Sequence, residues 1–495
     1  MKNFKIITIL LVFFSSTVAC DDKFGDINTD PLALSDIPDE YLFTKAVRQT
    51  FDCGNISLFQ MRFASQYAHI YVTNNENRAA DGYKDFHTQD VYKEMYASLY
   101  IISLRYINEV LLMTQPGGKH ENPVRYAMAK IVACVNFAHA TDFWGDVPYF
   151  DGAMGSTGVL YPEYDSQEVI YHEMMNDLNS SIQVLQSADP SMGYVGADPI
   201  YNNDFDKWIR FANSLRLRLA MRARFVDPDN SAVVITECMN QPLIESNDQN
   251  FELKHEESEN PEFYSPWYDL RKSMDWKMSD KFTEWLKTTN DPRLTVLVDT
   301  AGFDEYRGYM NGLNDQAFGL TTWSDYSAPK EALYSKSLSQ FEMTASEVWF
   351  LKAEAALFGL TTGDANLMYQ TGIQLNLNLW NVSEDEINTY MANEPEATLN
   401  GTTENQFRQI STQMWIAFVP NFTEAWSNIR RTGYPVIPQR TDAAIYELGV
   451  TDGILPSRFK YSTTEYLNNL NNLNAAIEIQ GPDKIDTHVW WDVRN

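Results

Sequence analysis

Cysteine, positive charge and long apolar runs are all scarce in this sequence. Its 495 residues include only 4 cysteines and 38 Lys and Arg against 67 Asp and Glu, which gives a formal net charge of -29. A field of this sign repels phosphate backbones, so the composition argues against nucleic-acid binding. The cysteines form no CxxC pair, so neither a disulfide framework nor a zinc site is indicated. With 44% hydrophobic and 21% charged residues, the chain has the composition of a folded globular protein.

Signatures of catalysis and of cofactor binding are also missing. The sequence contains no HExxH, GxSxG, GxxxxGKS/T or GxGxxG motif, and its 7 histidines are scattered singly. His139 lies in an apolar helical run, which favours a packing role over that of a general base. Asp142 and Asp146 flank the predicted end of a helix and the turn after it. We therefore expect a protein that is not an enzyme and that has no cofactor, metal or catalytic residue.

The amino terminus has the pattern of a secretory signal. A short basic start precedes an uncharged run from Ile6 to Val18. At about 1.5 Å per residue this run reaches about 20 Å, which is too short for a hydrocarbon core of about 30 Å. The small residues before Cys20 and the two aspartates after it resemble a bacterial lipobox. We predict that residues 1–19 are a signal peptide and that Cys20 is the lipidated first residue of the mature chain.

Helical periodicity dominates the rest of the chain. Residues 90–113 carry apolar side chains at a spacing of three and four, and proline and glycine mark a turn at 115–118. With a second helix from Pro123 to about Phe143, this pattern predicts an antiparallel helical hairpin. Further helices are expected at 166–186, 204–225, 231–240, 279–288, 341–358, 366–379, 383–393, 404–418, 422–430 and 463–475. Strand-like alternation is weak and short, so we expect a mainly α fold.

The helix expected at 204–225 concentrates positive charge in an otherwise acidic chain. Its arginines are Arg210, Arg216, Arg218, Arg222 and Arg224. They point in several directions around the helix, so some must face protein and need carboxylate or carbonyl partners. Glu347 and Glu354, which lie on one stripe of the helix expected at 341–358, are the predicted partners. The alternative function for these arginines is a binding patch for an anionic substrate.

Three segments with little helical signal carry polar and aromatic residues: 72–87, 256–276 and 303–334. Long loops often carry function. Sugar sites combine flat aromatic platforms with Asp, Asn and Arg side chains that bind the hydroxyls. We therefore predict polar contacts from the first segment and aromatic platforms in the other two. The predicted ligand-binding residues are Asn74, Asn77, Arg78, Asp81, Trp267, Tyr268, Trp323 and Tyr326.

Several strings, taken in their order along the chain, resemble the SusD/RagB-like nutrient-binding lipoproteins of the bacterial outer membrane. They include NTDP at 28–31, TDFWGDVPY at 141–149, WIRFANSLRLR at 208–218, NDPR at 290–293, ASEVWFLKAEA at 345–355, RRTGYP at 430–435 and PSRF at 456–459. The resemblance implies a SusD-like fold, in which degenerate tetratricopeptide-like helix pairs support a loop-rich part. It also implies one domain over residues 20–495.

The function that the resemblance implies is that of a surface receptor. Such a lipoprotein binds an oligosaccharide, or a similar nutrient, and acts as the lid of a TonB-dependent, SusC-like β-barrel transporter in the outer membrane. Peptide binding is the alternative within the same family. A surface glycoside hydrolase and a purely structural helical adaptor are alternatives from other classes. The matching strings are mainly scaffold, so the resemblance transfers no binding residue, and the predicted site rests on loop composition alone.

Substituting Cys20 by alanine tests the predicted lipid anchor. Stable anchoring takes two or more acyl chains, each buried methylene contributing about 0.8 kcal/mol. The Cys20→Ala variant should therefore leave the membrane fraction of fractionated cells, as measured by immunoblotting. The Cys238→Ala variant, which removes a cysteine elsewhere, should stay in that fraction. Undiminished membrane association of Cys20→Ala would contradict the lipoprotein prediction.

Overall fold

The computed structural model describes residues 37–52, 59–74, 78–85, 91–273, 275–302 and 304–494. The predicted signal peptide, Cys20 and Asn77 lie outside these residues. Among the helices of the described ranges, none combines the length and the apolar character that crossing a bilayer requires.

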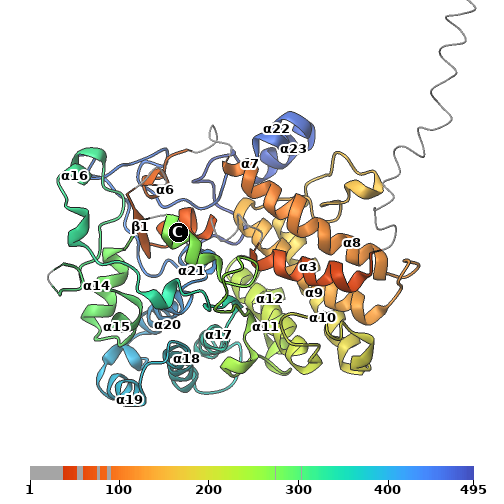
Figure 1. Cartoon of the computed structure of the whole chain (residues 1–495), viewed down its shortest axis with the longest axis horizontal. Coiled ribbons are helices and arrows are strands. Elements are labelled where there is room, and N and C mark those ends of the chain that lie inside the picture. Colours follow the sequence, from red (N-terminus) through yellow and green to blue (C-terminus); the bar gives the residue numbers. More distant parts are fainter. Residues whose placement is uncertain are drawn as a thin grey trace, which may run out of the picture.

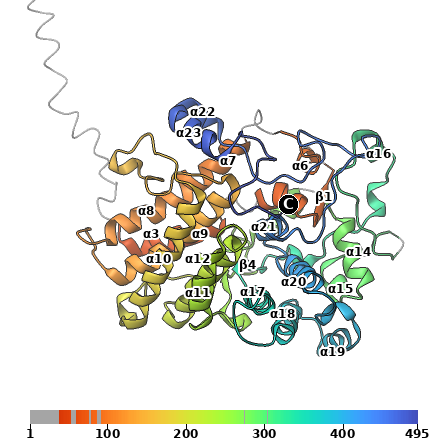
Figure 2. The same cartoon turned by 180° about the vertical axis from the view of Figure 1, so that it is seen from behind.

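Helices form most of the molecule, which Figures 1 and 2 show as two halves along its longest axis. One half contains α3 (Asp39–Asp52), α7 (Val91–Tyr96), α8 (Arg105–Thr114), α9 (Pro123–Trp144), α10 (Gln167–Ser187), α11 (Phe205–Ala223) and α12 (Pro228–Met239). The other contains β1 (Tyr71–Thr73), α6 (Arg78–Asp81), α14 (Asp280–Thr288), α15 (Arg293–Leu297), α16 (Asp315–Gly319) and α19 (Glu384–Asn393). Nearer the middle lie α17 (Ala345–Leu357), α18 (Ala365–Leu379), α20 (Thr403–Ala417) and α21 (Phe422–Thr432). The remaining helices and strands are α5 (Ser65–Tyr67), β2 (Phe251–Leu253), α13 (Pro266–Ser273), β3 (Trp276–Met278), β4 (Gln340–Met343), α22 (Thr463–Asn468) and α23 (Leu470–Gln480).

Most of the predicted helices are confirmed. Helix α9 begins where Asn122 accepts hydrogen bonds from the backbone of residues 124 and 125 and Pro123 takes the first helical position. It packs beside α8 as the predicted hairpin (Figure 1). It ends at Gly145, whose φ of 82° is a conformation that favours glycine. The prediction that Asp142 and Asp146 flank a helix end is therefore confirmed.

The structure corrects three of the predicted helices and contains others that were not predicted, among them α3 and α13. The helix predicted at 90–113 is divided by a π-helical segment, Ala97–Leu104, between α7 and α8. The helix predicted at 463–475 is interrupted at Asn469. Residues 341–343 belong to strand β4 because they pair with β2. Helix α13 lies within the segment 256–276, where its aromatic and charged residues had suggested a loop.

Two short antiparallel strand pairs join segments that are far apart in the sequence. Strands β2 and β4 form one pair, and β1 pairs with β3 so that Tyr71 lies opposite Met278. The backbone of Tyr309 lies beside the end of β3, where its N–H donates to the Met278 carbonyl at 2.7 Å. The three loop segments predicted from the sequence therefore meet at one place.

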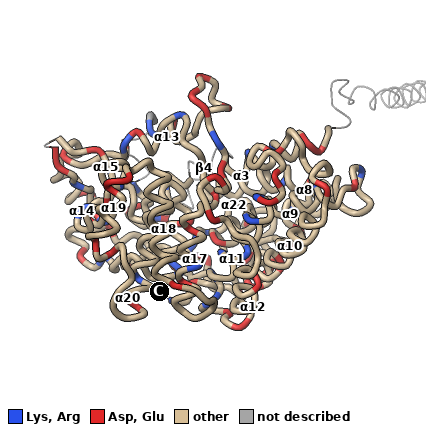
Figure 3. The backbone as a smooth tube through the Cα atoms, turned by 90° about the horizontal axis from the view of Figure 1, so that it is seen from below, with Lys and Arg blue, Asp and Glu red and all other residues tan. Residues whose placement is uncertain are grey.

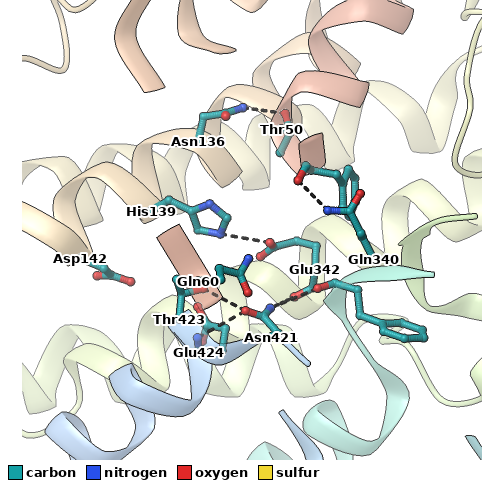
Figure 4. A network of polar contacts seen from close by, with 12 residues as sticks. Thr50, Gln60, Asn136, His139, Asp142, Gln340, Glu342, Asn421, Thr423 and Glu424 are labelled. Carbon is teal, nitrogen blue, oxygen red and sulfur yellow. Dashed lines mark hydrogen bonds and ion pairs between the residues drawn. The ribbon is translucent and has the colours of Figure 1, made fainter. Parts of the chain in front are cut away.

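A buried group of ion pairs joins α9, α11, α21 and β4. Arg222 forms ion pairs with Asp142 of α9 and with Glu424 of α21. His139 of α9 points toward Glu342 of β4, with Nε2 3.0 Å from Oε2 (Figure 4). Although burial lowers it, the Glu342 carboxylate brings the pKa of His139 above its ordinary value. His139 is therefore part of the buried charge network, in agreement with its predicted packing role.

The predicted pairing of Glu347 and Glu354 with arginines of α11 is confirmed. Arg218 Nε lies 2.6 Å from Glu347 Oε1, and Arg224 Nε lies 2.7 Å from Glu354 Oε1. Glu354 also binds Arg431 of α21 at 2.6 Å. The other α11 arginines are engaged as well, with Asp206, Glu237, Asp142 and Glu424 as their partners. The arginines of α11 thus stabilise the scaffold, and the alternative of an anion-binding patch is wrong.

Replacing Arg218 by methionine should strongly destabilise the protein. The substitution leaves Glu347 as a buried, uncompensated carboxylate and removes one of the two cationic partners of Glu342, which costs about 3–5 kcal/mol. Urea denaturation followed by circular dichroism measures the change in the free energy of unfolding. Arg210→Met is the matched control, because Arg210 is on the same helix but forms a partly exposed pair with Asp206, for which a loss below about 1 kcal/mol is expected. Equal losses in the two variants would contradict the structural role of the buried pairs.

Candidate functional site

Four aromatic side chains of the segment 303–334 form a group around Tyr309, which we call the Tyr309 cluster: Tyr309, Phe318, Trp323 and Tyr326. The ring centre of Tyr309 lies 4.8 Å from that of Trp323, 4.5 Å from that of Tyr326 and 5.8 Å from that of Phe318. Tyr309 is only 1% exposed, whereas the other three rings are half-buried. The cluster therefore presents three partly exposed rings on one buried ring.

Short turns hold these rings in place. Helix α16, which contains Phe318, begins where Asn314 accepts a hydrogen bond from the Ala317 N–H at 2.8 Å. The hydroxyl groups of Tyr309 and Thr321 lie 2.7 Å apart. Figures 1 and 2 place α16 with α6 and β1 at the same end of the molecule, away from α8 to α10. The cluster thus lies in the loop-rich half.

Asp275 connects the cluster to the segments before β3 and after β1. Its Oδ2 accepts a hydrogen bond from Trp323 Nε1 at 2.6 Å and one from Asn74 Nδ2 at 3.4 Å. Lys277, two residues further along, places its ammonium 5.7 Å from the centre of a Trp323 ring. A carboxylate, an amide and an ammonium therefore surround one edge of the cluster.

Arg78 of α6 covers another part of the cluster. Its guanidinium carbon lies 4.2 Å from the centre of the Phe318 ring. It donates to the Leu313 carbonyl at 3.0 Å and forms an ion pair with Asp315. Arg78 therefore fixes the segment that carries Phe318 while its side chain stays partly exposed.

Asp81 supports the cluster from its buried side. It is 1% exposed and accepts hydrogen bonds from Asn311 Nδ2 at 2.8 Å and from the Gly312 N–H at 2.5 Å. Burial raises the pKa of Asp81, and the charge of Arg440, at 3.5 Å, opposes this effect. Gly312 has a φ of 76°, and a Cβ atom there would overlap the Arg440 guanidinium. Asp81 thus holds the backbone next to Tyr309, and its carboxylate faces protein.

The structure brings together only part of the predicted site. Asn74, Arg78, Trp323 and Tyr326 meet at the Tyr309 cluster. Trp267 is 3% exposed and lies edge-on to Phe422 at 5.8 Å, so we leave it and Asp81 out of the candidate site. Tyr268 is half-buried beside Tyr264 on α13, with the ring centres 5.5 Å apart.

Sequence reasoning missed two polar members and two aromatic members of the site. Tyr309 and Phe318 lie in the aromatic-rich segment 303–334, so composition alone was a usable signal. Asp275 and Lys277 had no such signal, because the contacts of β3 with β1 and with the backbone of Tyr309 bring them to the cluster.

The described part of the chain contains several cavities. One of about 850 Å³ is lined by α3, residues 195–197 and residues 262–263. Another, of about 600 Å³, lies between α14–α15 and α19. A smaller cavity of about 190 Å³ includes Met310 and Asn311, directly after Tyr309. We take the Tyr309 cluster as the candidate site because it joins exposed aromatic rings to hydrogen-bonding side chains.

Within the described ranges, no group of three or more His, Cys, Asp and Glu side chains is placed to hold a metal ion. The arrangement at the Tyr309 cluster therefore offers aromatic stacking and hydrogen bonding. Both are suited to a sugar, whose rings have apolar C–H faces and hydroxyl edges.

Comparison with known families matches residues 31–462 to a SusD-like family described as starch-binding and associating with the outer membrane. No curated protein sequence matches the chain.

Solved structures resemble the whole described fold. A chitin-binding protein is 25% identical with a TM-score of 0.77, over 91% of this chain and 100% of its own. A chitin-binding SusD homologue from Flavobacterium johnsoniae is 23% identical with a TM-score of 0.79, over 92% of this chain and 99% of its own. A SusD homologue from Bacteroides uniformis is 24% identical with a TM-score of 0.75, over 93% of this chain and 100% of its own. The predicted fold, mainly α with tetratricopeptide-like helix pairs, is confirmed.

Proposed function

This chain belongs to the SusD-like family, and from that membership we propose that it binds an oligosaccharide at the surface of a bacterial cell and does not break it. The Tyr309 cluster is the observation that carries the proposal. Its three half-buried rings and the hydrogen-bonding groups of Asn74, Arg78 and Asp275 lie together at one end of the molecule.

The proposed binding mode follows from the chemistry of these groups. The C–H faces of a sugar ring stack on Trp323 or Tyr326, each aromatic contact contributing about 0.5–1.5 kcal/mol beyond the area that it buries. Asn74 and Arg78 donate hydrogen bonds to hydroxyl groups, and the Asp275 carboxylate accepts them. No bond of the glycan has to break for this binding, so we propose a receptor and not an enzyme.

We further propose that the protein is a lipoprotein anchored through Cys20 in the outer membrane. In this proposal residues 20–495 form one domain, which closes as a lid over a TonB-dependent, SusC-like β-barrel transporter. The description of the matched family as associating with the outer membrane supports the location. Enclosure between lid and barrel would expel water and strengthen the polar contacts to the ligand.

The names of similar solved structures favour a glycan ligand over a peptide. Two of the similar structures are described as chitin-binding. Peptide binding remains the second candidate within the family, since aromatic and asparagine side chains also suit an extended backbone. A glycoside hydrolase or a structural adaptor would be distinguished by its products or by its lack of any saturable ligand.

A binding screen of the purified mature protein against oligosaccharides and peptide mixtures tests this function. We expect saturable calorimetric binding of an oligosaccharide, whose length chromatography then finds unchanged. Trp323→Ala and Tyr326→Ala should each weaken binding about 2- to 10-fold, because 1.4 kcal/mol corresponds to about tenfold in affinity.

Two control variants sharpen the screen. Tyr161→Ala removes a tyrosine that is 67% exposed and outside the cluster, so it should leave affinity unchanged. Tyr268→Ala tests the predicted position on α13, and a larger loss there than at Trp323 would move the site. Binding of peptides alone would overturn the glycan proposal, and shorter sugar products would establish a hydrolase.

A further inference from the structure

Each partly exposed ring of the Tyr309 cluster has a cation beside it. Besides Arg78 at Phe318, the Lys277 ammonium lies 5.7 Å from the centre of a Trp323 ring, and the Arg307 guanidinium carbon lies 4.6 Å from the centre of the Tyr326 ring. These cations come from three segments of the chain: α6, β3 and the loop before Tyr309. The positive charges therefore gather at the rings that we propose as the sugar platform.

The charge of two of these cations is not balanced by a direct ion pair. Arg78 is paired with Asp315. For Lys277 and Arg307, no carboxylate oxygen of the described residues lies within 4.0 Å of a side-chain nitrogen. Carboxylates are abundant, because the chain has 67 Asp and Glu, and Figure 3 shows them spread along the chain. Within the described residues, an acidic protein thus leaves Lys277 and Arg307 without a carboxylate partner at its candidate binding site.

Lys277 is half-buried, so its charge is less well hydrated than that of an exposed lysine. Burial lowers the pKa of Lys277; the Asp275 carboxylate opposes this effect in part, and the positive charge of Arg271 adds a smaller lowering. Asp275 itself accepts hydrogen bonds from Trp323 and Asn74. An anionic group of a ligand would offset the remaining cost of burying the Lys277 charge, which Asp275 offsets only in part.

Packing alone accounts for only part of this arrangement. A cation over an aromatic ring gains a modest attraction at an exposed site, whatever the ligand. That contact uses a face of the cation and leaves most of its N–H donors available, since an ammonium has three and a guanidinium five. Charge-assisted hydrogen bonds to an anion are about twice as strong as those between neutral groups. The hydroxyl groups of a neutral sugar can accept some of these hydrogen bonds, but they leave the two positive charges uncompensated.

We propose that the glycan bound at the Tyr309 cluster is acidic, carrying carboxylate or sulfate groups that bind Lys277 and Arg307 while its rings stack on Trp323 and Tyr326. This inference rests on the proposed function and names the class of glycan. Uronic acids and sulfated sugars share the chemistry that the two cations recognise.

Matched pairs of ligands test the proposal on the purified mature protein. One pair is an oligogalacturonide and its methyl ester, and the other is a sulfated oligosaccharide and its desulfated form. We expect the acidic member of at least one pair to bind about 10-fold more tightly by calorimetry. The pair with the larger ratio identifies the anionic group. This advantage should shrink when salt is raised, because the Debye length is about 10 Å at 0.1 M and shorter above that concentration.

Two variants assign the preference to the cations. Lys277→Met keeps an apolar stem near Trp323, and Arg307→Gln keeps hydrogen-bonding capacity at an exposed position; each should reduce the ratio of acidic to neutral affinity about 3- to 10-fold. Lys330→Gln is the control, because it removes one positive charge from the same segment at a lysine that donates to the Thr295 carbonyl. Circular dichroism confirms that each variant is folded.

The outcomes separate this inference from the function on which it rests. Equal affinity for the acidic and neutral members of both pairs, or an unchanged ratio in both variants, would overturn the acidic-ligand proposal while glycan binding stands. Absence of binding to every glycan would overturn both.

Discussion

The buried guanidinium groups of α11 are the constraint on which the rest of the molecule depends. Burying an arginine costs several kcal/mol unless carboxylates and carbonyls surround it with suitable geometry. Arg218 and Arg222 meet this condition only when α9, α17, α21 and β4 all lie in their observed places. The charges therefore select one arrangement of the helices, beyond what apolar packing would specify.

A few direct contacts with the helical scaffold fix the position of the half that contains the Tyr309 cluster. Trp415 of α20 donates its indole N–H to the Ala68 carbonyl at 2.8 Å, just before β1. The ring of Phe422, at the start of α21, lies 5.0 Å from that of Tyr71 in β1. Strand β1 then places β3, and β3 places the backbone of Tyr309. The helical body thus holds the segments that form the Tyr309 cluster in place.

Local signals in the sequence predicted the helices and the partners of the α11 arginines, because periodicity and charge act over short distances or demand compensation. The strands could not be predicted, since β1 and β3 are three residues each and have value only as a pair. Composition identified the aromatic segments but could not separate the buried Trp267 from the half-buried Trp323, because both lie among similar residues. Asp81 was predicted to bind ligand because it is polar, but it is buried beside Arg440, which is far away in the sequence. The lipid-anchor prediction concerns residues outside the described ranges.

The Tyr309 cluster is built from three segments that are far apart in the sequence, and this separation determines when the cluster can form during folding. Asp81 and Asn311, whose hydrogen bond supports the cluster, are 230 residues apart in the sequence. Contacts between residues so far apart in the sequence form slowly, because closing the long loop between them costs conformational entropy. The hairpin of α8 and α9 joins neighbouring segments and can form early, whereas the Tyr309 cluster must wait for segments that are far apart in the sequence. The cluster is therefore completed late in folding, because its supports include Trp415, Phe422 and Arg440, which all follow it in the sequence.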